Sequence, residues 1–393
     1  MTIADIDKPI GPASDELYAR ATGRLPGGNS RTTVFVPPHP PYARRGAGYL
    51  VEDVDGNELI DLQNNYTALI HGHAYGPVVE AASAAIASGA SFGLPTESEV
   101  RLAGILGERL GWATHWRFAN SGTEAVMIAL RAARAITGRD VIVRFAGCYH
   151  GSYDAVLAKG AAGVPAGLDA DVVEVPLEDL DAVVRAMDER EVACVLFDAM
   201  PNRAGLRPAD PDFVKALREE TRRRGVLLVQ DEVLTYRIAL GGLHSTYGIQ
   251  PDLVTLGKVI GGGLPIGAIG GTAETMAVFD PTRPDALPHG GTFSANPVSM
   301  EAGIAALRDF DAAATERLNA LGDRLRTGLA DLGFEVAGRG SLVRLHDPEP
   351  ARLWWAAYRQ GLLLCGNGLA CLSTPMDDAT VDEILRRFAD VER

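Results

Sequence analysis

Residues 210–232 read DPDFVKALREETRRRGVLLVQDE and contain the unit from which the fold is built. The first part has the spacing of an amphipathic helix, and the apolar run VLLV that follows is typical of a buried strand. Similar short runs lie on either side, VACVLFDA at 192–199 and DLVTL at 252–256. Helices of this length between such strands indicate βαβ units, so we expect the strands to be parallel.

The same alternation extends toward the N-terminus to about residue 76, which predicts an α/β fold with a mostly parallel sheet covered by helices. Further strands are expected in HWRFA, DVIVRFA and DVVEVP, at 115–119, 140–146 and 171–176. Near the start of the chain, YLVEDVDGNELIDL predicts a hairpin around Asp55-Gly56, and short strands return after residue 330. We expect the two ends to form one smaller α+β domain, with an N-terminal segment at 1–65, a large domain at 66–298 and a C-terminal part at 299–393.

The composition and net charge of the chain argue against several classes of binding partner and cellular location. The 393 residues carry a net charge of −14, and the longest basic run is RRR at 222–224, which argues against nucleic acid or an anionic membrane as partner. The four cysteines form no C-x-x-C pair, and the acidic start MTIADIDKPIGPASDEL has no apolar core. We therefore expect a cytoplasmic protein with reduced thiols, no signal peptide and no membrane span.

Several common motifs are absent or incomplete. EDVDGNE at 52–58 lacks the glycine and glutamate spacing of a calcium loop, and His71 and His73 have no cysteine or carboxylate at a metal-ligand spacing, so we predict no metal site. The chain has no G-x-x-x-x-G-K-[ST] and no G-x-S-x-G, and GKVIGGGLPIG does not fit G-x-G-x-x-G.

Three features remain that suit one ligand. Asn120-Ser121-Gly122-Thr123 lies between an expected strand and an expected helix, where backbone N–H groups bind a phosphate, although a plain helix cap explains the same residues. Asp231 ends a buried strand, where a carboxylate needs a cation or a strong donor.

The third feature is Lys258, which stands between an apolar run and a cluster of glycines in PDLVTLGKVIGGGLPIGAIGG at 251–271. A desolvated lysine loses its charge easily and attacks a carbonyl to give a Schiff base. A phosphate cradle, a buried aspartate and such a lysine together predict pyridoxal phosphate, an aldehyde with a phosphate and a basic ring nitrogen.

The chain resembles the class III aminotransferases of fold type I, which depend on pyridoxal phosphate, and among them the branch similar to glutamate-1-semialdehyde 2,1-aminomutase. The resemblance covers nearly the whole chain and rests on FANSGTEA, GCYHGSYD, DEVLTYRIALGG, PDLVTLGKVIGGGLPIGAIGG and HGGTFSANPVSMEAG, in the family's order. It implies a large domain with a mostly parallel seven-stranded sheet, small-molecule amino donors and keto acceptors, and a homodimer.

The resemblance also implies residue roles. Lys258 would form the Schiff base and then move a proton, and Asp231 would pair with the pyridinium nitrogen. The remaining cofactor positions that it implies are Ser121, Gly122 and Thr123 at the phosphate, Tyr149 and Val233 on the two faces of the ring, and Thr292, which would reach the phosphate of the neighbouring subunit and make the active site shared.

One segment departs from the family. Where the family reads like EPVQG, residues 197–205 read FDAMPNRAG, so that Asp198 takes the place of the glutamate. The glutamine that contacts the ring oxygen is replaced by Pro201 or Asn202, depending on the alignment. This departure points to an unusual substrate or cofactor pose.

The substrate is suggested by NSRTTVF at 29–35, which resembles the β-phenylalanine aminotransferases. In that subgroup the position of Arg31 is an arginine, whose fork matches a carboxylate, although a solvated surface arginine is the alternative. The subgroup's second arginine is replaced here by Asn367, which argues against α-amino acid donors such as glutamate.

We therefore expect an aminotransferase that acts on a β-amino acid or a related amino compound. An aminomutase that moves the amine within one molecule shares every cofactor residue and is the main alternative. A decarboxylase or epimerase also stays open, because the protein decides which bond breaks. A catalytically silent binding protein is disfavoured by the joint presence of Lys258, Asp231 and the phosphate loop.

Overall fold

The computed structural model of the chain describes residues 10–165, 167 and 171–392. The first nine residues of the predicted N-terminal segment and the last residue of the predicted C-terminal part lie outside this range. The chain divides into two compact units, a larger one at Pro77–Thr315 and a smaller one made of Met1–Gly76 and Glu316–Arg393. The domain boundaries expected after residues 65 and 298 stay predictions.

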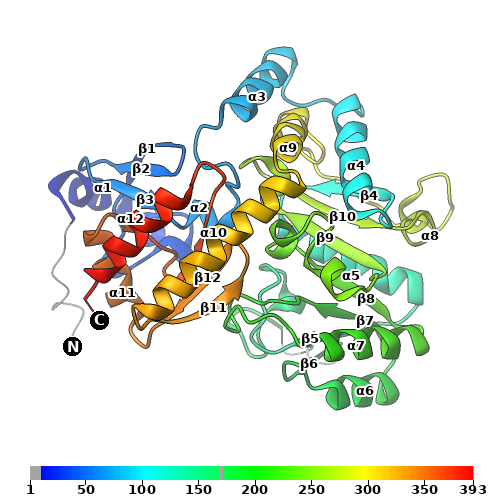
Figure 1. Cartoon of the computed structure of the whole chain (residues 1–393). Coiled ribbons are helices and arrows are strands. Elements are labelled where there is room, and N and C mark those ends of the chain that lie inside the picture. The colour runs from blue at the N-terminus through cyan, green and yellow to red at the C-terminus, as the bar shows by residue number, and fades with distance from the viewer. Residues whose placement is uncertain (1–9, 166, 168–170, 393) are drawn as a thin grey trace. The chain divides into compact units, whose positions relative to one another are not determined.

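The larger unit is built on the sheet that the sequence predicts. Its seven strands follow one another in the order β4, β10, β9, β8, β7, β5, β6 (Figure 1). All neighbours run parallel except β10, which is antiparallel to both β4 and β9. The predicted α/β fold with a mostly parallel seven-stranded sheet is therefore confirmed. The strands are β4 (His115–Ala119), β5 (Val141–Phe145), β6 (Val172–Val175), β7 (Val192–Phe197), β8 (Leu227–Asp231), β9 (Leu253–Gly257) and β10 (Gly267–Gly271).

Helix α5 (Gly122–Thr137) packs across strands β7 to β10 and supplies much of the core. The helix begins after Ser121, whose side chain caps it, and ends at Gly138. Gly138 has a φ of 66°, a left-handed conformation that glycine adopts easily because it has no β-carbon. Val126, Ala129 and Leu130 pack in one cluster with buried residues of six strands of the sheet. The other helices of this unit are α3 (Gly76–Ser88), α4 (Glu97–Leu110), α6 (Leu180–Glu189), α7 (Pro211–Arg223), α8 (Ala273–Met276), α9 (Pro297–Asp309) and α10 (Ala312–Asp331), of which α10 continues into the smaller unit.

The helix of the opening motif, α7, begins with two strong signals, the side chain of Asp210 as cap and Pro211 in the first turn. Arg218 on its buried face makes a bidentate ion pair with Asp252, at 2.6 and 2.8 Å. Asp252 also accepts a hydrogen bond from the Leu228 backbone at 2.7 Å. This carboxylate thus connects α7, β8 and the start of β9.

Strand β10 was not predicted, because its sequence GAIGG has few of the β-branched residues that mark strands. Glycines occur in β10 because neighbouring segments leave no room for a β-carbon. A β-carbon on Gly270 would lie 2.4 Å from the Trp116 ring of β4, and one on Gly267 would lie 2.0 Å from the Ser121 carbonyl oxygen. Close packing of main chain, rather than strand propensity, selects this sequence.

The smaller unit contains two sheets. One has the order β1-β2-β3-β13, and the other has the order β11-β12-β14. The predicted hairpin around Asp55-Gly56 is confirmed as the antiparallel pair of β2 and β3. The elements are α1 (Pro12–Thr22), β1 (Ala43–Ala47), β2 (Leu50–Asp53), β3 (Glu58–Asp61), α2 (Asn64–Thr67), β11 (Glu335–Arg339), β12 (Leu342–His346), α11 (Pro350–Arg359), β13 (Leu362–Leu363), β14 (Leu369–Cys371) and α12 (Asp378–Ala389).

None of the helices in the described part of the chain combines the length and the apolar character that a membrane span requires.

We expect Gly267→Ala to destabilise the protein, because the new β-carbon would meet a backbone oxygen that cannot rotate away. Overpacking of this kind costs about 1–3 kcal/mol. The matched control is Gly104→Ala inside α4, where a β-carbon has no heavy atom within 4 Å, and it should stabilise the helix by about 0.5–1 kcal/mol. Denaturant unfolding of both variants measures the difference, and equal midpoints would contradict the steric account.

Candidate active site

Apart from Thr292, the predicted site residues of the larger unit lie at the carboxyl edge of the sheet, where open α/β sheets bind ligands. Strand β8 ends at Asp231, and β9 ends one residue before Lys258. Tyr149 follows β5, and α5 begins directly after Ser121.

The loop before α5 divides its groups between capping and binding. The Ser121 hydroxyl accepts a hydrogen bond from the Glu124 backbone at 3.2 Å, and the Glu124 carboxylate accepts one from the Asn120 backbone at 2.6 Å. Gly122 and Thr123 lie in the first turn, whose N–H groups have no partner inside a helix. The loop therefore caps α5 through Ser121, and its first-turn N–H groups are of the kind that bind an anion.

Close packing of small residues brings this loop to the ends of β8 and β9. A β-carbon on Gly122 would lie 2.8 Å from a Val233 methyl carbon. A β-carbon on Gly257 would lie 3.3 Å from Val233 and 3.6 Å from the Gly122 α-carbon. Val233, the phosphate loop and the residue before Lys258 are thus in mutual contact range.

The GCYHG loop after β5 joins the same assembly. A β-carbon on Gly151 would lie 2.5 Å from the Thr123 hydroxyl oxygen, which also accepts a hydrogen bond from the Ser152 backbone at 3.3 Å. Tyr149 is 43% exposed, and the Arg203 guanidinium lies 4.0 Å from the centre of its ring. This cation–π contact holds the tyrosine from the FDAMPNRAG segment.

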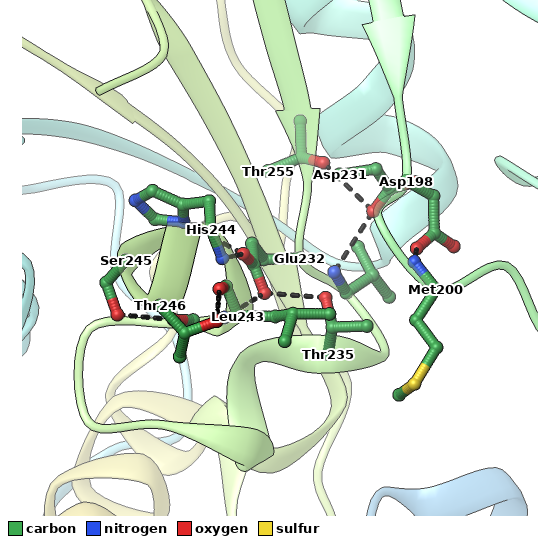
Figure 2. Close-up of polar contacts among 12 residues, drawn as sticks. Asp198, Met200, Asp231, Glu232, Thr235, Leu243, His244, Ser245, Thr246 and Thr255 are labelled. Atoms are coloured by element: carbon green, nitrogen blue, oxygen red, sulfur yellow. Dashed lines mark hydrogen bonds and ion pairs between the residues drawn. The ribbon is translucent and has the colours of Figure 1, made fainter. Parts of the chain in front are cut away.

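Asp231 is buried among hydrogen-bond donors. Its carboxylate accepts a hydrogen bond from the Thr255 hydroxyl at 3.2 Å (Figure 2). It also accepts one from the Val233 backbone at 3.0 Å and contacts His150 Nδ1 at 2.7 Å. Burial acts to raise the pKa of Asp231, but the hydrogen bond and charge of His150, together with the Val233 N–H and the Lys258 ammonium, lower it below the ordinary value. A carboxylate whose pKa is lowered in this way suits a protonated ring nitrogen.

His150 was missed by sequence reasoning, although it follows Tyr149 in the quoted motif. It is 2% exposed, and among the described residues its Nε2 atom has no hydrogen-bond partner. The contact with Asp231 places it as the group that orients and charges this carboxylate. The available sequence signal was its place in the GCYHG motif, because its contact with Asp231 joins residues that are 81 positions apart in the chain.

Glu232, the neighbour of Asp231, is entirely engaged in the fold. Its carboxylate accepts hydrogen bonds from the Thr235 hydroxyl at 2.5 Å and from the backbones of Leu243 and His244 at 3.0 and 2.7 Å. His244 Nδ1 adds a contact at 2.8 Å. Figure 2 shows these groups gathered around Glu232, on the other side of the strand end from Asp198.

Lys258 is half-buried, so part of the side chain that the sequence predicts to be desolvated is exposed in this structure. The residue stands at the open end of β9 rather than inside the sheet. Its φ is +50°, a left-handed backbone that a lysine rarely adopts. Such local strain persists only where the surrounding structure requires it, and it is common at functional sites.

Asp198 lies beside this carboxylate pair and is 6% exposed. One oxygen accepts a hydrogen bond from the Met200 backbone at 2.9 Å. Burial, followed by the charge of Asp231, raises the pKa of Asp198 to about 7. In the same segment Pro201 is buried and Asn202 is half-buried.

The other predicted residues lie elsewhere. Thr292 is exposed in the loop before α9, where the nearby Gly291 position faces Asn120, with 3.6 Å from an added β-carbon to the amide nitrogen. Arg31 and Asn367 belong to the smaller unit. Arg31 is exposed and donates to the Asn65 amide oxygen at 2.8 Å, and Asn367 accepts a hydrogen bond from the Leu369 backbone at 3.2 Å.

A lysine, a charged buried aspartate and an anion cradle at one sheet edge define the class of enzymes that hold a phosphorylated aldehyde on this fold. Comparison with known proteins gives the family: residues 35–391 match aminotransferase class III, and the chain belongs to it.

Two curated relatives carry an aminomutase name. The chain is 40% identical to the glutamate-1-semialdehyde 2,1-aminomutase of Methanothermobacter thermautotrophicus, over 85% of this chain and 83% of that protein. It is 42% identical to glutamate-1-semialdehyde 2,1-aminomutase 2 of Brevibacillus brevis, over 81% of this chain and 78% of that protein.

Solved structures of similar chains carry both transaminase and aminomutase names. An omega-transaminase from Sphaerobacter thermophilus is 43% identical with a TM-score of 0.93, covering 96% of this chain and 97% of that one. A transaminase with PLP bound is 43% identical with a TM-score of 0.92, covering 97% of both chains. A β-phenylalanine aminotransferase from Variovorax paradoxus is 36% identical with a TM-score of 0.90, covering 96% of this chain and 93% of that one.

We expect Asp198→Asn to stabilise the protein at alkaline pH. Because the pKa of Asp198 in the folded protein, about 7, lies above its ordinary value of 3.8, the stability that its proton contributes is complete below about pH 4 and lost as the pH rises to about 7. The amide keeps an acceptor for Met200, so the free energy of unfolding at pH 8 should rise by about 1–3 kcal/mol.

The comparison is urea unfolding of both proteins at pH 5 and pH 8, with the exposed Asp331→Asn as control. A gain that is no larger at pH 8 than at pH 5 would show that Asp198 is not held protonated by its surroundings.

Proposed function

We propose that this enzyme is a pyridoxal phosphate-dependent aminotransferase whose amino donor is a β-amino acid or a related amino compound with a single carboxylate. The observation that carries the proposal is the state of Arg31. Its guanidinium is exposed, it has one neutral hydrogen-bond partner, and no carboxylate pairs with it among the described residues. An arginine presented in this way has most of its five N–H donors left for a substrate.

The residues present fit the cofactor. Two first-turn N–H groups and the hydroxyl of Thr123 suit its phosphate, the charged carboxylate of Asp231 suits a protonated ring nitrogen, and Tyr149 and Val233 are apolar surfaces for the ring. Lys258 supplies the amine that holds the aldehyde carbon. Pyridoxal phosphate, when bound, supplies an electron sink that stabilises negative charge at the substrate carbon.

The chain's own groups control the proton. Asp231, held by His150, Thr255 and the Val233 backbone, keeps its negative charge in place throughout. Lys258 Nζ, once uncharged, takes the proton from the substrate carbon and returns it to a neighbouring atom. Arg31 binds the substrate carboxylate and so limits the donors to amino compounds that carry one.

Asn367 supports a monocarboxylate substrate. Its side-chain oxygen is occupied by the turn at Gly368, where it accepts from the Leu369 backbone. An amide carries no charge and makes no bidentate ion pair, so it replaces an arginine poorly for a second carboxylate. Dicarboxylic donors such as glutamate are therefore disfavoured.

The aminomutase function is the second candidate, and the names of the curated relatives favour it. The cofactor residues serve both reactions equally. The two differ in whether the keto product leaves: a transaminase releases it after one half-reaction, and a mutase keeps it and returns the amine.

A homodimer is also proposed, on the basis of an exposed apolar surface between residues 79 and 100. Helix α3 buries none of its residues within the chain, and Val79 and Ile86 are 50% and 59% exposed. Phe92 and Leu94 in the next loop are 52% and 77% exposed. A surface of this kind is typical of a protein contact, and a second copy of the chain fits the family, with Thr292 then placed at the partner's phosphate.

The substrate proposal predicts the outcome of a single turnover. Stoichiometric holoenzyme mixed with 3-amino-3-phenylpropanoate should lose its visible cofactor absorbance while one equivalent of keto acid is released, whereas Lys258→Ala should release none. An unchanged spectrum, with release of an isomerised amine from an amino-aldehyde, would favour the mutase instead.

The dimer proposal predicts that the wild-type chain sediments as a dimer at micromolar concentration. Ile86→Glu with Leu94→Asp should give a folded monomer, because charges then lie in the contact. Leu177→Asp, at a position that is 40% exposed outside this surface, is the control and should remain dimeric. A monomeric wild type would refute the proposal.

A further inference from the structure

The smaller unit contains a left-handed turn made entirely of non-glycine residues. Asn64, Asn65, Tyr66 and Thr67 have φ values of 46°, 47°, 55° and 75°. The ψ values of the central two are 58° and 46°, so the backbone follows a left-handed helix for one turn. L-residues normally enter this region singly, which makes four in succession a strong outlier.

Hydrogen bonds of a buried polar cluster around Asp61 and Asn64 stabilise the turn. Asp61 Oδ1 accepts hydrogen bonds from the backbones of Gln63 and Asn64, each at 2.8 Å. Asn64, fully buried, donates to the carbonyl oxygens of Asp61 at 2.9 Å and Cys371 at 3.1 Å. His73 Nε2 contacts the second Asp61 oxygen at 2.7 Å. These contacts maintain a backbone that the local sequence alone would not adopt.

The turn also contacts the segment that contains Arg31. Asn65 accepts a hydrogen bond from Arg31 Nη1 at 2.8 Å, and the Tyr66 hydroxyl donates to the Thr33 carbonyl oxygen. On the other side, Asn29 Oδ1 accepts from the Arg31 backbone at 2.9 Å. Asn65 is exposed, so its strained backbone gains no core packing and serves the contact with Arg31.

The hydrogen-bond partner of Arg31 is a neutral amide, that of Asn65, and this choice of side chain bears on what Arg31 can bind. An amide oxygen fixes one N–H of a guanidinium without cancelling its charge, and it leaves the other donors for a bidentate carboxylate. An aspartate at the same position would also fix the arginine, but it would compete with a substrate carboxylate for it. Asn65 is thus the kind of residue that orients a cation for an incoming anion.

We propose that the left-handed turn Asn64–Thr67 positions Arg31, and that Asn65 is the positioning residue through which the enzyme selects substrates with a carboxylate. This inference rests on the proposed function, in which Arg31 binds that carboxylate. Asn65 acts through Arg31 and takes no part in the chemistry.

The test measures binding and specificity in the holoenzyme. Calorimetry with 3-phenylpropanoate, which has the carboxylate but no amine, should show Kd raised about tenfold in Asn65→Gly, the effect of one lost hydrogen bond to a charged group. Asn65→Asp should weaken binding at least as much, because the new carboxylate pairs with Arg31. Turnover of 1-phenylethylamine, which has no carboxylate, should stay within about twofold of wild type in both variants.

Glycine at position 65 fits a φ of +47° without strain, so Asn65→Gly should unfold at the same or higher denaturant concentration than wild type. That result separates positioning from a structural role. Gln250→Glu, an added charge at an exposed site of the larger unit, is the matched control for Asn65→Asp and should bind 3-phenylpropanoate normally.

Arg31→Met distinguishes the two levels of the hypothesis. If it loses 3-phenylpropanoate binding while both Asn65 variants keep wild-type Kd values, the positioning inference is wrong and the proposed function stands. If Arg31→Met itself binds normally, the carboxylate role of Arg31 is wrong, and the inference about the turn fails with it.

Discussion

Two adjacent carboxylates at the end of β8 constrain the rest of the larger unit. A buried carboxylate is tolerated only with strong donors, so each must collect its partners from neighbouring elements. Glu232 takes two backbone N–H groups, a hydroxyl and an imidazole, and so fixes the chain at Leu243 and His244. Asp231 takes donors from β9 and from the loop after β5. One carboxylate organises the fold and the other organises the site.

The spacing of the site depends on the absence of side chains as much as on their presence. Gly122, Gly151 and Gly267 each approach another segment so closely that a β-carbon would lie within 3 Å of it. These approaches bring the loop before α5 close to Val233 after β8, to the GCYHG loop and to β10, without bulky residues between them. The chemistry-bearing side chains can therefore converge, because the main chain beneath them is packed at its closest distance.

The sequence predicted well those parts in which local pattern and tertiary role agree. The fully buried strand β7 is a continuous apolar run between helices, so the alternation of such runs with helices predicts it. Strand β10 was not predicted, because its glycines are required by close contacts with Trp116 and Ser121, and the local sequence pattern does not show such contacts. The turn Asn64–Thr67 escaped for the same reason, since Asp61 and the distant Cys371 impose it. His150 belongs to the GCYHG motif, but the sequence alone does not show that it contacts Asp231.

Non-glycine residues in left-handed backbone occur at two places that the proposed chemistry uses, Lys258 and the turn beside Arg31. Each such residue costs about 1–3 kcal/mol of stability, and glycine would remove most of that cost. Glycine would also remove the side chain, which at Lys258 is the amine and at Asn65 is the contact with the carboxylate-binding arginine. At these two places the strained backbone therefore carries a side chain that the proposed chemistry requires, whereas Ala74, Glu178, Leu206 and Ala295 adopt a positive φ elsewhere in the chain.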